Sequence, residues 1–482
     1  MIAGRIAETG RTREPATPAE NVALGWRFMT PLGLGSVLNP INSSMIATAL
    51  IPIGNDLDVS ATQTASLVSS LYLACAVAQP TLGRIGDVLG ARRVFLLGTF
   101  LVGIGSLVGA TASALWCLVL ARVLIGIGTS AAYPNAILII RRRELEAPTL
   151  DPRPALGVLT LTAQVTAAAG LPLGGVLVAA WGWRSIFLFN LIPVVLCLVM
   201  TLLWIPRDPR SRAGSLRELF RRIDPFGVLL FGGAMSGLLI ALQSLGSVNV
   251  VALVGFVLGM VALLVWELRA RSPFIDIRSL ARNGPLSRTY LRTALTYATT
   301  YTMMFGFTQW LQDDRGFPAW LAGLAMLPMT AVAAILGWFV SRRGTVRLAL
   351  RLTGLAVVGT STGMAFLTDS TPLPFIFLTS LGFGIVLGCM SPSNQSALYR
   401  QAPADNIGAS AGLFRTSIYL GAIGSSALTA MAFSSGVDAG SLRIMAASLV
   451  AAGVALMILT FTDRSLPRRI RPSGGDADDE SR

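Results

Sequence analysis

Few side chains in this sequence are suited to chemistry. All 38 basic residues are arginines, and neither lysine nor histidine occurs, which excludes acid–base catalysis by histidine and metal ligation by histidine. The four cysteines lie singly within long apolar stretches, without the spacing of metal ligands or of a disulfide framework. No nucleophile with a neighbouring base is visible, so we expect no enzymatic activity, no metal and no cofactor. What is left is arginine, 24 carboxylates and neutral polar groups.

One arginine stands well inside an apolar run. Arg122 lies within the stretch 115–140, where a charge is costly and normally faces a polar interior or a cavity. At a rise of about 1.5 Å per helical residue, Asn42 and Ser43 of the stretch 28–53 fall at a similar depth. We therefore expect a central cavity for a small molecule, lined by polar side chains of the apolar runs. The predicted set is Asn39, Asn42, Ser43, Arg122, Asn135, Gln164, Asn394 and Arg415.

Each of these side chains has an alternative role. Polar residues within apolar helices often hydrogen-bond to neighbouring helices. A buried arginine can likewise be held by backbone carbonyls alone, which is the alternative for Arg122.

No carboxylate lies in the middle of an apolar run. Those nearest to the runs are Asp56, Asp58, Asp87, Glu267, Asp313 and Asp314. An arginine cannot act as a proton carrier because its pKa stays above about 12. If the function requires a proton to be carried, it must be carried by an edge carboxylate such as Asp313 or Asp314, or by the bound substrate. A cavity with a fixed positive charge and no acid favours an anionic, zwitterionic or neutral amphipathic ligand.

The elements that must position these residues are helices within a membrane. With 53% hydrophobic and 13% charged residues and a mean hydropathy of +0.66, the chain is too apolar for a soluble protein. A span of the hydrocarbon core needs about 20 apolar residues. Fourteen such stretches predict an all-α polytopic membrane protein with fourteen transmembrane helices. They are residues 28–53, 63–83, 94–112, 115–140, 155–180, 186–205, 225–245, 248–266, 289–311, 318–340, 346–367, 373–392, 409–433 and 442–461.

The arginines between these stretches predict an orientation. They are concentrated in the N-terminal segment, in alternate gaps and after the last stretch, whereas only Arg184, Arg315 and Arg443 fall in the other gaps. Because arginine-rich loops stay in the cytoplasm, both termini are predicted to be cytoplasmic. The net charge of +14 therefore indicates topology and not a nucleic-acid partner. Exclusive use of arginine is typical of a GC-rich bacterial genome, which predicts the plasma (inner) membrane.

A glycine-bearing turn follows the second stretch. Its pattern G-x-x-x-D-x-x-G-x-R-R comprises Gly83, Asp87, Gly90, Arg92 and Arg93. It resembles the loop motif of the major facilitator superfamily, which implies that these residues form a conformational latch between two halves. Val88 and Ala91 stand where that family usually has basic residues, which implies a weaker latch.

The fifth stretch ends in Gly170-Leu171-Pro172-Leu173-Gly174-Gly175. These small residues permit close helix packing, and the string resembles the glycine-proline motif of antiporters in the same superfamily, with the proline one position late. Gly170, Pro172, Gly174 and Gly175 would carry this motif.

With fourteen predicted spans and Arg122 in a matching fourth-helix motif, the chain resembles the fourteen-helix drug:proton antiporter family. The resemblance implies two pseudo-symmetric six-helix halves with two inserted helices. The implied organisation is a cytoplasmic N-terminal segment (1–27), a six-helix half (28–205), a cytoplasmic linker (206–224), inserted helices (225–266), a cytoplasmic loop (267–288), a second six-helix half (289–461) and a disordered cytoplasmic tail (462–482). One departure is important. Ser43 stands at or near the position of the acid usually found in the family's first helix.

The predicted function is secondary active efflux of small hydrophobic or amphipathic compounds, of the multidrug type, by alternating access. Coupling to the proton gradient is expected, with the chain acting as a monomer in the lipid bilayer. Two alternatives stay open: a transporter of lipids or lipid precursors, and a membrane sensor that does not transport.

Overall fold

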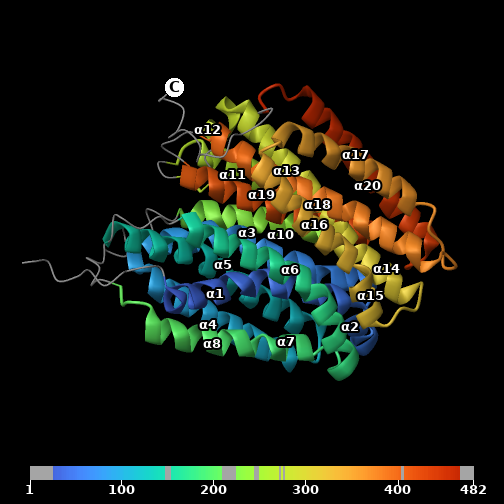
Figure 1. The fold of residues 1–482 in the computed structure, drawn as a ribbon, viewed down its shortest axis with the longest axis horizontal. Coiled ribbons are helices and arrows are strands. Elements are labelled where there is room, and N and C mark those ends of the chain that lie inside the picture. The colour runs from blue at the N-terminus through green and yellow to red at the C-terminus, as the bar shows by residue number, and fades with distance from the viewer. Residues whose placement is uncertain are drawn as a thin grey trace, which may run out of the picture.

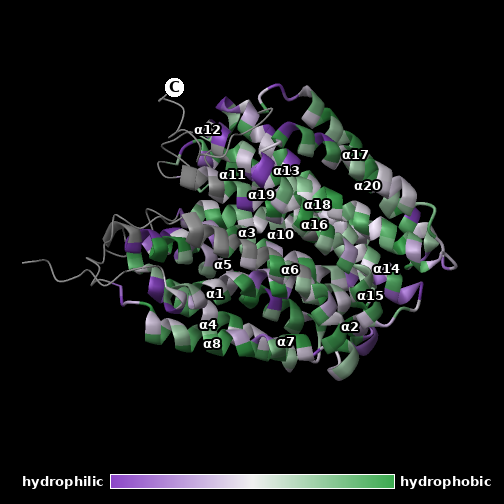
Figure 2. Ribbon diagram, viewed as in Figure 1, coloured by the Kyte–Doolittle hydropathy of each residue, from purple (hydrophilic) through white to green (hydrophobic). Residues whose placement is uncertain are grey.

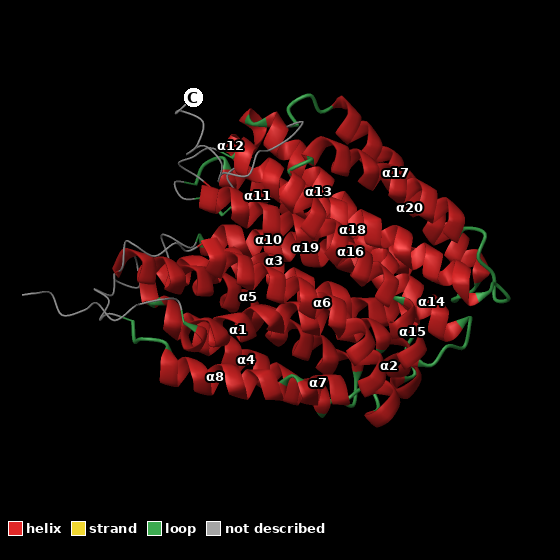
Figure 3. Cartoon of the chain, in the orientation of Figure 1, coloured by secondary structure: helices red, strands yellow, loops and turns green. Residues whose placement is uncertain are grey.

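The computed structural model describes residues 25–146, 153–208, 224–243, 249–270, 273–274, 277–402 and 407–466. Within these ranges the regular secondary structure is helical throughout (Figure 3). The predicted side chain of Gln164 and most of the predicted segments 1–27, 206–224 and 462–482 lie outside the described residues.

The first part of the chain forms one bundle. Its elements are α1 (Trp26–Met45), η1 (Ile46–Thr48), α2 (Leu50–Leu57), α3 (Ala61–Leu89), α4 (Ala91–Ala110), α5 (Leu115–Glu146), α6 (Arg153–Trp181), α7 (Ser185–Phe189) and α8 (Leu191–Trp204). We call these elements the first half.

The last part of the chain forms a second bundle, which we call the second half. Its elements are α12 (Ile277–Arg282), α13 (Gly284–Thr302), η2 (Met303–Phe307), α14 (Thr308–Asp313), α15 (Ala319–Ala325), α16 (Leu327–Arg343), α17 (Val346–Met364), α18 (Leu373–Gln401), α19 (Ile407–Ala432) and α20 (Ala439–Thr462). Between the halves in sequence stand α10 (Pro225–Gln243) and α11 (Val250–Glu267), which we call the inserted pair.

Figure 1 shows the first half in blue to green below the second half in yellow to red, with α10 between them. Helix α10 packs against α3 of the first half, α19 of the second half and its partner α11. Helices α3 and α19 also pack against each other, so α10 covers a seam between the halves. The bundle has two ends, which we name by residues. The Asp56 end carries α2, which is labelled at the right in Figure 1, and the Asp87 end is the opposite one, where α3 ends and α4 begins.

Local sequence explains where several helices begin. Ser60 and Gln63 form a capping box at the start of α3, and Asp438 and Ser441 form another at the start of α20. Asn249 and Asn283 cap α11 and α13 by accepting backbone N–H bonds. Hydrophobic residues then extend along the helices, and hydrophilic ones are most frequent near the ends of the bundle (Figure 2).

Within the described residues, each of the fourteen predicted stretches overlaps a helix or consecutive helices. By length and composition, eight helices within the described residues could cross a membrane, or nine if the bent α1–α2 pair is one span. The protein is therefore a multi-pass membrane protein, and the number fourteen stays a prediction. Helices α13 and α17 are less apolar than the eight because they carry threonines and two arginines each, Arg288 and Arg292 in α13 and Arg347 and Arg351 in α17.

Two helix interruptions face each other across the halves. In the first half, the 3₁₀ turn η1 separates α1 from α2, and the two segments are bent by 59°. In the second half, the π-helical segment η2 separates α13 from α14. The two interruptions contact each other, and a π-helical segment within a helix often marks a functional position.

Two predicted boundaries are displaced. The tail was expected to be disordered from residue 462, but Asp463 and Leu466 are buried, so packing continues at least to Leu466. Helix α13 begins at Gly284, five residues before the predicted start of that span, because Asn283 caps it there and Pro285 fits its first turn.

Candidate functional site

Arg122 is fixed within the first half by backbone carbonyls. Its guanidinium is buried, with Nε donating to Leu67 O at 3.0 Å and Nη1 donating to Asn42 O at 3.1 Å. Nη2 has no hydrogen-bond partner among the described residues. The geometry therefore matches the alternative role, in which the arginine ties α1 and α3 to α5, and within the described part of the chain no carboxylate pairs with it.

Asn39 and Asn42 also connect helices of the first half. Asn42 and Asn190 exchange amide hydrogen bonds at 3.2 and 2.7 Å, and Asn190 precedes α8. Asn39 Nδ2 donates to Thr129 Oγ1 on α5 at 3.0 Å and to Cys75 Sγ on α3 at 3.2 Å. These bonds satisfy buried polar groups, so the Asn39–Asn42–Arg122 group joins four helices. Ser43 lies beside it on α1 and is buried.

Arg415 lies where the two halves meet. From α19 it stacks over the ring of Tyr133 on α5, with 4.3 Å between the guanidinium carbon and the ring centroid. Tyr297 and Tyr419 are close enough to act on it electrostatically. The Tyr419 hydroxyl donates in turn to Gln79 Oε1 on α3. Arg415 is therefore a cation in tyrosine-rich surroundings at the seam.

An aromatic cluster extends from this point across the halves. The ring centroids of Tyr72 on α3 and Tyr301 on α13 are 5.1 Å apart, and those of Tyr301 and Phe305 are 5.7 Å apart. Tyr72 also lies 6.1 Å from Tyr419. Phe305 belongs to η2, so the π-helical segment helps to form the cluster. The sequence analysis missed this cluster; tyrosines inside apolar runs were the available signal.

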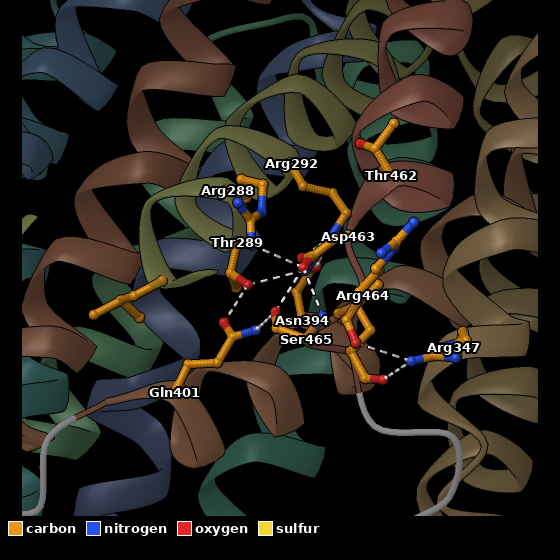
Figure 4. A network of polar contacts seen from close by, with 12 residues as sticks. Arg288, Thr289, Arg292, Arg347, Asn394, Gln401, Thr462, Asp463, Arg464 and Ser465 are labelled. Carbon is orange, nitrogen blue, oxygen red and sulfur yellow. Dashed lines mark hydrogen bonds and ion pairs between the residues drawn. The ribbon is translucent and has the colours of Figure 1, made fainter. Parts of the chain in front are cut away.

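Asn394 lies in a different polar network, within the second half (Figure 4). Its Oδ1 accepts from Arg292 Nε at 2.8 Å, and Arg292 pairs with Asp463 at 3.4 Å. Arg288 pairs with the same carboxylate at 3.1 Å. The network therefore joins α13, α18 and the residue after α20, and it places Asn394 away from Arg122.

Burial alone would raise the pKa of Asp463. A hydrogen bond from Ser465 and the pairs with Arg288 and Arg292 outweigh the burial, so the pKa lies below its ordinary value. Asp463 is thus held ionised, which is unsuitable for a proton carrier in this conformation.

Asn135 belongs to the Asp87 end. Its Nδ2 donates to Ala131 O at 2.7 Å and to Leu82 O at 3.3 Å. A Cβ placed on Gly86 would lie 1.8 Å from Asn135 Oδ1. Asn135 therefore supports the close approach of α5 to the glycine-bearing turn. The seven predicted cavity residues whose side chains the structure describes thus separate into the Arg122 group, Arg415 at the seam, Asn394 in the second half and Asn135 at the Asp87 end.

The glycine-bearing turn is built around a carboxylate that sequence reasoning missed. Asp208 accepts from the backbone N–H groups of Arg92 and Arg93 at 3.2 and 3.0 Å, and from Arg142 Nη1 at 2.8 Å. Gly90 has φ of +104°, and a Cβ there would lie 2.5 Å from Asp208. Asp208 therefore caps α4 in the space that Gly90 leaves open.

Other residues of the predicted latch lie around this cap. Arg92 Nη2 donates to Leu202 O at 3.0 Å, within the first half. Gly83 faces Pro134 on α5, and Asp87 is exposed at the end of α3. A contact of this turn with the second half stays a prediction.

The glycine-proline string on α6 packs in two directions. Gly170 and Gly174 face Ser44 and Met45 of α1. Gly175 faces the second half, where a Cβ would lie 2.5 Å from Ala319 O. Gly323 on α15 packs in the same way against Leu171 O, with Pro172 beside it. The string therefore lets α6 and α15 close together at the Asp56 end.

Replacing Gly175 by alanine should force α6 and α15 apart, since backbone atoms occupy the position of the new Cβ. The expected result is about a fivefold faster reaction of a Leu171→Cys reporter with a membrane-impermeant maleimide, because Leu171 is fully buried in the closed contact. Gly255→Ala is the matched control, since a Cβ at Gly255 meets open space. Equal labelling rates in the two variants would show that this contact does not close the Asp56 end.

The Asp56 end also carries a cavity and the predicted proton site. A cavity of about 720 Å³ lies between α2, α6 and α15, and Asp56 at its edge accepts from Trp183 Nε1 at 3.1 Å and Arg184 at 2.9 Å. Asp313, beyond the predicted span 289–311, is exposed. Although its side chain is exposed, neighbouring protein atoms partly desolvate the carboxyl group, and this desolvation and the Asp314 carboxylate raise its pKa. Within the described residues, no cluster of three or more metal-ligand side chains is present.

Sequence comparisons show the family of the chain and several proteins to which it is similar. The model of the family described as "Major Facilitator Superfamily" matches residues 32–426. The chain is 33% identical to an uncharacterized MFS-type transporter, YwoD, of Bacillus subtilis, covering 90% of this chain and 95% of that one. It is 30% identical to the multidrug resistance protein Stp of Mycobacterium tuberculosis, covering 79% and 71%. It is also 26% identical to the tetracenomycin C resistance and export protein of Streptomyces glaucescens, covering 85% and 77%.

Solved structures share the fold. A crystal structure of the peptide transporter POT has a TM-score of 0.65 at 18% identity and covers 92% of this chain and 95% of that one. A crystal structure of the nucleoside transporter NupG has a TM-score of 0.61 at 15% identity, with coverage of 89% and 98%. At these identities the likeness concerns the fold alone.

Proposed function

This chain belongs to the major facilitator superfamily, and from that premise we propose that it exports small hydrophobic or amphipathic compounds by alternating access. Relatives named for multidrug resistance and for tetracenomycin C export support the direction and the substrate class. Two helix bundles that meet at a seam, each with an interrupted helix at the meeting point, are suited to rocking about a central site.

The proposal includes the finer family and topology. The chain is a fourteen-helix drug:proton antiporter with the domain boundaries predicted above, apart from the longer packed C-terminal segment. The Asp87 end, where the arginines concentrate, is cytoplasmic, and the membrane is the plasma membrane.

The observation that carries the substrate proposal is Arg415. It lies at the seam among Tyr133, Tyr297 and Tyr419, and its described contacts include no carboxylate. A cation with aromatic neighbours can bind an anionic group while the rings contact an apolar body. We therefore place the site for anionic, zwitterionic or neutral amphipathic compounds at Arg415, and give Arg122 a structural role.

Arg415→Gln should reduce efflux of anionic compounds about tenfold, because one charge-assisted hydrogen bond is lost, and should leave matched neutral compounds nearly unchanged. Uptake into inside-out vesicles of paired anionic and neutral dyes measures both. Arg415→Lys keeps the charge and should restore part of the anion transport. Arg443→Gln, at an exposed arginine, is the control. Equal losses for both dye classes would contradict an anion-binding role for Arg415.

The energy source is tested in the same vesicles. With an acidified interior followed by a pH-sensitive dye, addition of a substrate should release protons in wild type but not in the Asp313→Asn/Asp314→Asn double variant. Proton release that persists in this variant would exclude the pair as the proton site. Substrate-independent movement of labelled lipid would favour a lipid transporter instead.

A further inference from the structure

The inserted pair carries two buried carboxylates at the Asp87 end. Asp224 stands directly before α10, and Glu267 is the last residue of α11; the exposed fractions are 7% and 2%. A Cβ placed on Gly227 would lie 2.5 Å from Asp224 Oδ2 and 2.9 Å from Glu267 Oε1, so the two carboxylates face the same point. Buried carboxylates need compensation by a cation or by hydrogen bonds.

Asp224 joins the segments of the inserted pair. Its Oδ1 accepts from Gly227 N at 3.1 Å and from Trp266 Nε1 at 2.9 Å, and its Oδ2 accepts from Phe274 N at 3.2 Å. Its own backbone is left-handed, with φ of +51°. These bonds hold the start of α10, the end of α11 and the following segment together as one unit.

A cation of the first half lies near these two carboxylates. Arg84 on α3 donates from Nη2 to Pro273 O at 3.2 Å, and the Asp224 and Glu267 carboxylates both act on its guanidinium electrostatically. Arg84 is half-buried and belongs to the glycine-bearing turn, at a position that the turn's pattern leaves free. Charge complementarity therefore links the inserted pair to α3.

The contact with the second half is of a different kind. Helix α10 packs against both α3 and α19, but the hydrogen bonds of Asp224, Ser236 and Asn249 all stay within the inserted pair and the segment that follows it. Helix α11 packs on α10 and exposes most of its apolar surface, with Val251 83% exposed. A surface of this kind, on a multi-pass membrane protein, faces lipid.

We propose that the inserted pair is a seal for the α3–α19 seam, clamped to the first half by Arg84. It moves with the first half, and α19 slides along α10 when the halves rock. The inference rests on the proposed alternating access, but it does not depend on the substrate or on the coupling ion.

Spin-label distances test the clamp directly. Spin labels are attached to cysteines at three exposed apolar positions. Leu97 on α4 reports the first half, Val251 on α11 the inserted pair and Leu355 on α17 the second half. Cys117 is replaced by serine, and the other three native cysteines are buried. Distances are measured pairwise in lipid nanodiscs at low and neutral pH. The Leu97–Leu355 distance reports rocking of the two halves, whereas the Val251–Leu97 distance reports the clamp. Failure of the proposed alternating access can therefore be distinguished from failure of the clamp.

We expect one narrow Val251–Leu97 distribution under all conditions, and a Val251–Leu355 distribution that changes together with Leu97–Leu355. Arg84→Gln should widen the Val251–Leu97 distribution about twofold, because the carboxylates lose the cation that the first half supplies. Arg84→Lys should keep it narrow. Arg141→Gln, at an exposed arginine of the same end, is the control. A constant Val251–Leu355 distance with a changing Val251–Leu97 distance would assign the pair to the second half and overturn the proposal.

The Arg84→Gln variant tests the clamp even if no rocking is observed. If the Val251–Leu97 distribution keeps its wild-type width in this variant, Arg84 does not clamp the inserted pair to the first half.

A disulfide adds a functional test. A Cβ on Gly232 of α10 would lie 3.7 Å from Val77 Cγ2 of α3, so the pair Val77→Cys/Gly232→Cys is placed to cross-link. Oxidation should leave transport within about twofold of the reduced protein, because the two helices move together. Loss of transport that reduction reverses would show that α10 must separate from α3.

Discussion

Asp463→Asn is expected to destabilise the second half by about 3–5 kcal/mol, because it leaves the fully buried guanidinium of Arg292 without its carboxylate. Arg292 also holds Asn394 and donates to Thr289 at 2.9 Å, so the loss extends to α18 and to the first turns of α13. The measurement is the midpoint of thermal unfolding in nanodiscs. Retained folding with reduced stability, followed by lower transport at 37 °C, is the expected phenotype.

An apolar exchange of the pair serves as the control. Arg292→Met with Asp463→Leu removes both charges, and a buried pair replaced in this way often costs little. The double variant should therefore unfold at a higher temperature than Asp463→Asn alone. Arg347→Gln, whose guanidinium donates to backbone carbonyls near the chain's described end, removes a neighbouring cation without leaving a buried charge. If Asp463→Asn and Arg347→Gln behave alike, the ion pair is not what stabilises this region.

The same network predicts a pH dependence. The pKa of Asp463 is lower in the folded protein than in the unfolded chain, so its stabilising contribution is fully present above the ordinary carboxyl value. It decreases as the pH falls through the lowered pKa. Loss of the Asp463 contribution should therefore lower the unfolding temperature of the wild-type protein only in strong acid. The difference between wild type and Asp463→Asn should stay constant from pH 5 to pH 8.

Gly90→Ala is expected to have the second large effect, about 3 kcal/mol or more. One part is the backbone, since φ of +104° is rarely adopted by a residue with a side chain. The other part is the Cβ itself, which would displace the Asp208 carboxylate from the N–H groups of Arg92 and Arg93. An unsatisfied helix start and an uncompensated Arg142 would follow. Thermal unfolding and the yield of folded protein measure the effect.

Gly436→Ala separates these two contributions. Gly436 has φ of +124°, but a Cβ there meets open space, so only backbone strain of about 1–2 kcal/mol is expected. The excess loss in Gly90→Ala then reports the displaced carboxylate. Equal losses in the two variants would mean that Asp208 adapts without cost and that the turn depends on backbone conformation alone.

Hydropathy was sufficient to place the helices, because each apolar run of about 20 residues must form its own backbone hydrogen bonds in lipid. It also located the glycine-bearing turn and the glycine-proline string. Gly90 and Gly175 were recognised from the pattern, but their physical partners, Asp208 and Ala319, lie 118 and 144 positions away along the chain. A pattern of local residues carries no information on such contacts.

The candidate site was less accessible to sequence reasoning. Depth along a helix placed Asn42 near Arg122 correctly, because depth follows from helical rise. Depth does not reveal which face of a helix a polar residue occupies. For this reason the prediction grouped Asn135 and Asn394 with Arg122, although they lie in other networks. Asp463 and Asp208 were overlooked because they follow the apolar runs, where a carboxylate normally meets water.

The ion pair between Arg292 and Asp463 joins residues 171 positions apart, and its acidic member directly follows α20. During synthesis, Arg292 enters the membrane long before its counter-charge exists. The second half can therefore reach its final packing only after residue 463 has been made, whereas Arg122 finds its carbonyl partners among residues already made. A ribosome that stalls before codon 463 would leave a first half that is able to fold beside a second half that is not.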